Sequence, residues 1–149
     1  MKKKLRPLKA VFYTLLGVFG ARLLYILTPM FELRERSEFL SQAIVILFYV
    51  LGISVFVLAI VLIVMTFKAK VKGAQKTFLL LTGFAPAGLV VFSVLHNAFD
   101  AFVEMTTGAL SAFLGFLSGA SFLIAIFAAP AVFIVGIVGS IVHFRKKRK

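Results

Sequence analysis

The chain has 149 residues, of which 62% are hydrophobic and only 15% are charged. Soluble domains carry roughly 25% charged residues, so this composition excludes an ordinary soluble protein and indicates an integral membrane protein. The net charge of +12 would suggest a nucleic-acid partner in a soluble protein. Here the basic residues flank apolar stretches, so we expect no nucleic acid. Cysteine is absent, which excludes disulfides, thiolate catalysis and thiolate metal ligands.

Four apolar stretches are long enough to cross the hydrocarbon core of a bilayer, which takes about 20 helical residues for about 30 Å. They cover residues 10–31, 39–67, 77–103 and 121–144. The polar segments between them are too short to fold separately, so residues 1–149 form a single membrane domain in this interpretation. We predict an all-α protein with four transmembrane helices in two hairpins. The basic start also resembles a signal peptide, but its apolar run exceeds the usual length of about 7 to 15 residues.

Basic residues gather at three places, residues 2–9, 68–76 and 145–149, and the apolar stretches separate them. All five carboxylates lie in or beside the two intervening segments: Glu32, Glu35, Glu38, Asp100 and Glu104. Because lysine and arginine resist translocation, this pattern predicts that both termini and the central loop face the cytoplasm. Anionic headgroups at that face are the expected partners of the basic clusters. A prokaryotic cell membrane is the expected location.

Residues 106–120 are apolar but span only 15 positions, fewer than the roughly 17 that a crossing needs. A fifth crossing would also place the basic C-terminal cluster outside, against the positive-inside rule. The sequence therefore predicts a short interfacial or re-entrant segment at the outer face. Its small residues, which include a GxxxG motif at Gly115 and Gly119, permit close helix packing.

Arg22 lies inside the first apolar stretch, about 18 Å along the helix from its inner end. An arginine near the bilayer centre costs about 2.5 to 3.5 kcal/mol on insertion scales, so we expect it to face protein or to reach toward the outer surface. An anion site or a gate against cations is the functional alternative. We predict that Arg22 pairs with Asp100 and fastens the first helix to the third.

His96, Asp100 and Glu104 repeat at intervals of four in the third stretch, so they share one helix face, with Asn97 beside them. Together with Arg22 they form the candidate polar network. Proton transfer or a divalent metal is conceivable at His96 and Asp100. The three side chains spread over about 12 Å of helix and cannot all reach one ion, so we expect no metal site and no cofactor.

Pro86 and Pro130 each lie inside an apolar stretch and remove a backbone hydrogen bond to the residue four positions earlier. We therefore expect a helix kink at both. Broken helices form binding sites in transporters, but proline is also common in ordinary membrane helices.

The chain has no recognisable nucleophile elbow, zinc-binding helix motif or phosphate loop, so we expect no catalytic activity. The favoured interpretation is an accessory or self-associating component of a helical bundle, working as a homo-oligomer or in a larger membrane complex. The alternative is a transporter or channel for small ions or solutes that acts as a parallel oligomer. In that alternative, Arg22 and the His96 and Asp100 ladder line the path.

Overall fold

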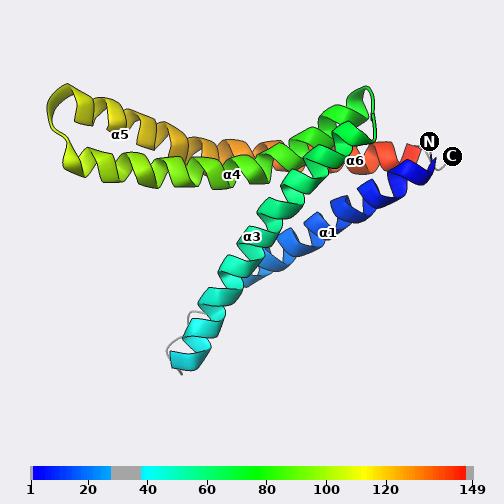
Figure 1. Ribbon diagram of the computed structural model, residues 1–149, viewed down its shortest axis with the longest axis horizontal. Coiled ribbons are helices and arrows are strands. Elements are labelled where there is room, and N and C mark those ends of the chain that lie inside the picture. Colours follow the sequence, from blue (N-terminus) through cyan, green and yellow to red (C-terminus); the bar gives the residue numbers. More distant parts are fainter. Residues whose placement is uncertain (1, 28–37, 147–149) are drawn as a thin grey trace. The chain divides into compact units, whose positions relative to one another are not determined.

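A computed structural model describes residues 2–27 and 38–146 of the chain. The regular structure in these residues is helical (Figure 1). The elements are α1 (Lys2–Leu27), α3 (Glu38–Lys68), α4 (Ala74–Met105), α5 (Gly108–Leu123), the π-helical turn η1 (Ile124–Ala128) and α6 (Ala129–Lys146). This confirms the predicted all-helical class.

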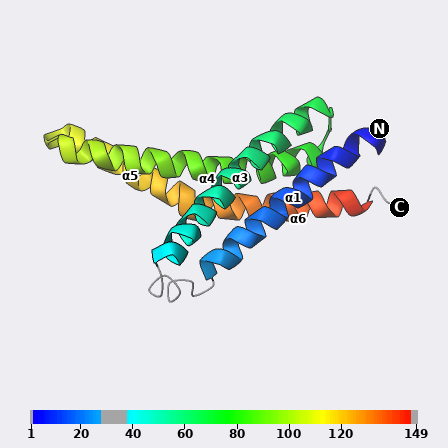
Figure 2. The same cartoon turned by 60° about the horizontal axis from the view of Figure 1, so that its bottom comes forward.

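The helices form two compact units, Met1–Ala69 and Lys70–Lys149. In the first unit, α1 packs against α3. In the second unit, α4 packs against α5, η1 and α6, and Figure 2 shows it running beside them along their length. Each unit is therefore a helical hairpin.

Four helical stretches among the described residues are long and apolar enough to cross a membrane. They are Leu5–Leu24, Gln42–Lys68, Ala74–Met105 and Gly108–Arg145. Large apolar side chains remain exposed on all of them, as expected of helices that face lipid. The predicted spans at 39–67 and 77–103 lie within α3 and α4. The outer turn predicted between the first two spans falls on residues 32–37, outside the described residues, and on Glu38, where α3 begins.

The predicted fourth span at 121–144 is part of a longer helical stretch. Residues 108–123 form α5, which continues through η1 directly into α6. The physical reason is that no charged residue and no glycine turn interrupts the chain between Gly108 and Phe144, so nothing stops the helix. At about 1.5 Å per residue, the combined helix is about 57 Å long and exceeds the hydrocarbon thickness of about 30 Å. The interfacial or re-entrant placement of residues 106–120 stays a prediction.

Glycines at positive φ begin both helices of the second hairpin. Gly73 has φ 63° and caps the start of α4, and Gly108 has φ 69° and opens α5. These left-handed conformations cost little in glycine because it has no Cβ. Only Thr106 and Thr107 separate α4 from α5, so the chain reverses within a very short turn.

That turn determines which residues of α4 and α5 lie at the same height. Each helix rises away from the turn by about 1.5 Å per residue, so residues equally far from Thr107 become neighbours. The hydrogen bond from the Ser111 hydroxyl to the Val103 carbonyl, 3.4 Å long, fits this register. The same register brings Ser118 to the level of His96.

Candidate functional site

The strongest polar cluster in the described residues joins α4 to α5. The Ser118 hydroxyl lies 2.7 Å from Nδ1 of His96 and donates a hydrogen bond of 3.0 Å to Oδ1 of Asp100. A longer contact of 3.4 Å connects the same hydroxyl to the His96 carbonyl. We call His96, Asp100 and Ser118 the Ser118 cluster. It contains two members of the ladder predicted from the sequence and one residue that the ladder lacked.

The positions of the protons in the Ser118 cluster follow from the number of hydrogens available. An ionised carboxylate only accepts hydrogen bonds, and a serine hydroxyl has a single hydrogen to donate. When Ser118 donates that hydrogen to Asp100, its oxygen accepts from the imidazole, so Nδ1 of His96 carries the hydrogen. The resulting chain of donors runs from His96 through Ser118 to Asp100.

Ser118, which bridges the cluster, is more buried than the two residues that it connects. Ser118 is only 3% exposed, His96 is half-buried, and Asp100 is exposed. The imidazole also contacts the Phe122 ring, with 5.1 Å between the ring centroids. A buried hydroxyl cannot bond to water, so leaving it without a partner costs more free energy than it does for an exposed hydroxyl. The hydrogen bonds of Ser118 should therefore stabilise the contact between the two helices.

This geometry differs from that of an activated serine nucleophile. A nucleophile donates its proton to the base, and a third group orients that base. In the Ser118 cluster the serine donates to the carboxylate and the imidazole faces its lone pair. The arrangement is a hydrogen-bonded joint between two helices.

The other two members of the predicted ladder lie outside this cluster. Asn97 is exposed, and its amide donates a hydrogen bond of 2.8 Å to the Ser93 carbonyl of its own helix. Glu104 is exposed at the end of α4, next to Met105, the last residue of that helix. Among the described residues, no group of three or more histidine, cysteine, aspartate or glutamate side chains is arranged to hold a metal ion.

Arg22 forms a second polar feature, within the first hairpin. Its guanidinium carbon lies 4.8 Å from the centroid of the Phe48 ring on α3. The guanidinium also lies beside Gly52, where a Cβ would be 3.3 Å from that carbon and 3.4 Å from each terminal nitrogen. Asp100 belongs to the other unit. The Arg22 to Asp100 pair therefore stays a prediction.

The helical structure around Pro86 differs from that around Pro130. Pro86 lies within α4, which continues from Ala74 to Met105. Pro130 is the second residue of α6 and follows the π-helical turn, in which the Ala129 amide bonds to the Ile124 carbonyl. The π-helical turn thus lies just before the proline. The helix kinks at Pro86 and Pro130 stay predictions.

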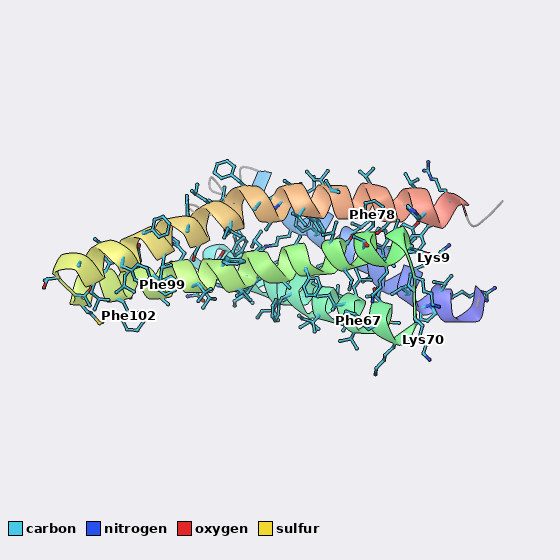
Figure 3. All side chains as sticks on the ribbon, turned by 90° about the horizontal axis from the view of Figure 1, so that it is seen from above. Lys9, Phe67, Lys70, Phe78, Phe99 and Phe102 are labelled. Carbon is cyan, nitrogen blue, oxygen red and sulfur yellow. The ribbon has the colours of Figure 1, made fainter. Side chains whose placement is uncertain are left out.

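Toward the Ala74 end of α4, the backbones of α4 and α6 approach very closely. A Cβ on Gly136 would lie 2.6 Å from the Thr82 backbone nitrogen, and a Cβ on Gly139 would overlap the Phe78 ring. Figure 3 shows Phe78 beside α6. Small residues thus allow two helix backbones to touch, the packing expected at membrane helix interfaces.

His143 closes this end of the interface. Its Nδ1 lies 2.9 Å from the Gly139 carbonyl, and its ring contacts Phe78 with 5.4 Å between centroids. A carbonyl can only accept, so Nδ1 of His143 donates. His143 therefore has a local structural role in α6.

No known protein family, curated protein or solved structure matches this chain.

Proposed function

We propose that this chain is a small multi-pass membrane protein without catalytic activity, an accessory or self-associating component of a helical-bundle assembly. In this proposal both termini lie in the cytoplasm of a prokaryotic cell. The basic clusters then contact anionic headgroups at the inner face, because lysine and arginine are retained there.

The observation that supports this proposal is that polar side chains connect one helix to another. Within their hairpins, Ser118 joins His96 and Asp100 across two helices, and Arg22 packs on Phe48. Polar residues in membrane helices commonly hold helices together in this way. A catalytic site would instead need an accessible nucleophile, base or metal arranged around a substrate.

The exposed face of α5 supports association with another helix. Gly115 and Gly119 lie one turn apart and are exposed, and no atom lies within 4 Å of the position where a Gly119 Cβ would be. Phe113 and Phe116 beside them are 58% and 71% exposed. Small residues let a second helix approach, and the flanking rings add contact area.

The test is purification from native membranes in a mild detergent, followed by native mass measurement and identification of every co-purifying protein. An accessory role predicts a partner in fixed stoichiometry. Self-association predicts a multiple of the chain mass, with two differently tagged copies recovered together. A chain that purifies as a monomer under conditions that preserve known complexes would refute the proposal.

The exposed carboxylates of α4 favour a second candidate, transport or channel activity in a parallel oligomer. Asp100 and Glu104 are both exposed on one helix face, as a path for cations would require. Cation flux into proteoliposomes should then fall on Asp100→Asn, and Arg22→Gln should change it if Arg22 lines the path. Asn97→Ala is the matched control, because Asn97 bonds only to its own helix. If proteoliposomes show no more flux than vesicles without protein, this candidate is excluded.

A further inference from the structure

Arg22 occupies a defined depth in the first hairpin. Along α1 it lies about 20 Å above Lys9, and on α3 its neighbour Gly52 lies about 24 Å above Lys68. If these lysines mark the inner boundary, the guanidinium lies in the outer half of a hydrocarbon core about 30 Å thick. Both counts, along different helices, place it above the midpoint of such a core.

The guanidinium is held in place on two sides. The Phe48 ring lies 4.8 Å from its central carbon, a distance at which a cation is attracted to an aromatic face. Gly52 leaves the space for it on α3, since even a methyl group there would crowd the guanidinium at 3.3 to 3.4 Å. These contacts orient the planar group without neutralising its charge.

One hydrogen-bond donor of Arg22, its buried Nε, has no partner among the described residues. Glu38 begins α3, about 15 Å along the helix from Phe48. A guanidinium has five donors, and an unpaired charge at membrane depth costs several kcal/mol. An anion at this position would remove that cost.

We propose that Arg22, Phe48 and Gly52 form a receptor for a phosphate oxyanion in the outer half of the first hairpin. The rigid fork of an arginine matches two oxygens of one phosphate, whereas a lysine offers only a point charge. The phosphate comes either from an outer-leaflet phospholipid headgroup or from free inorganic phosphate.

The test measures the distance between the Arg22 guanidinium carbon and phosphorus by solid-state NMR. Arginine is labelled with ¹³C, the protein is reconstituted in phosphatidylcholine vesicles, and ³¹P dephasing is recorded. The Arg22 signal is identified as the one missing from Arg22→Gln. Dephasing by lipid phosphorus supports the headgroup source. Dephasing only after inorganic phosphate is added to protein in a phosphorus-free detergent supports the free-anion source.

Two variants keep the result interpretable if Arg22→Gln folds poorly. Arg22→Lys retains the charge but loses the fork, and its labelled ammonium-bearing carbon should show no close phosphorus. Gly52→Ala retains the arginine but crowds the guanidinium at 3.3 to 3.4 Å, so the dephasing should weaken in a folded protein. Absence of dephasing in wild-type protein in both media overturns the proposal, as does dephasing that Gly52→Ala leaves unchanged.

Discussion

Ser118 serves two side chains of another helix with one hydroxyl group. It accepts from His96 and donates to Asp100, and it is almost fully buried between α4 and α5. The spacing of four residues along α4 predicts that His96 and Asp100 share one helix face. For the segment that contains Ser118 the sequence predicts only small-residue packing, because spacing within one helix says nothing about which residue of another helix will face it.

Replacement of the bridging hydroxyl should weaken the second hairpin. Ser118→Ala leaves Nδ1 of His96 and one oxygen of Asp100 without this partner, so we expect a loss of about 1 kcal/mol in the free energy of unfolding. The measurement is reversible unfolding in detergent or lipid. Asn97→Ala is the control and should change stability by less, because Asn97 is exposed and bonds only within α4. Equal effects of the two variants would contradict a bridging role.

Both histidines should carry their hydrogen on Nδ1, each because of a different hydrogen-bond acceptor. Nδ1 of His96 donates to a hydroxyl whose hydrogen is already directed to Asp100, and Nδ1 of His143 donates to the Gly139 carbonyl. We expect ¹⁵N NMR at neutral pH to show hydrogen on Nδ1 in both neutral rings. In Ser118→Ala, His96 should lose this preference while His143 keeps it. Hydrogen on Nε2 of His96 in the wild-type protein would disprove the proton arrangement.

At the scale of elements, α4 is the central helix of the second hairpin. Its half nearer Met105 meets α5 at the Ser118 cluster, and its half nearer Ala74 meets α6 at Gly136 and Gly139. The π turn η1 lies between these two contacts. Because a π turn contains one extra residue, it changes the rotation of α5 relative to α6 and so affects which faces meet α4. The sequence predicts a kink at Pro130 but gives no signal for the π turn that precedes this residue.

Glycine substitutions should separate the buried helix contact from the exposed face. Gly136→Ala would place a methyl group 2.6 Å from the Thr82 backbone nitrogen, which forces two helix backbones apart. We expect a destabilisation of about 1 to 3 kcal/mol, measured by unfolding. Gly119→Ala is the matched control, since no atom lies within 4 Å of its Cβ position, and it should be neutral or slightly stabilising. Comparable losses in both variants would contradict the close α4 and α6 contact.

For the whole molecule, the arrangement of charge predicts an orientation that the helices by themselves do not define. Basic residues gather near the turn between α3 and α4, and the carboxylates of α4 lie near the turn between α4 and α5. The two turns lie at opposite ends of a helix about 48 Å long. One of them should therefore face the cytoplasm and the other the outside.

Single-cysteine labelling can test this orientation directly, because the chain contains no cysteine. Lys72→Cys and Thr107→Cys place a thiol at an exposed position in each of the two turns. We expect a membrane-impermeant maleimide to label Thr107→Cys in intact cells and Lys72→Cys only after permeabilisation. The reverse pattern would invert the predicted topology, and equal labelling of both in intact cells would indicate mixed orientation.

The sequence by itself determined the four membrane-length helices, their grouping into hairpins and the approximate ends of α3 and α4. These properties depend on local quantities, namely the length of each apolar stretch and the residues that bound it. Only the tertiary structure decided that Ser118 bridges His96 and Asp100, that Phe48 and Gly52 hold Arg22, and that α5 continues into α6 through a π turn. Those outcomes depend on the rotation and height of one helix against another, which short turns and side-chain packing set and which no spacing along a single helix encodes.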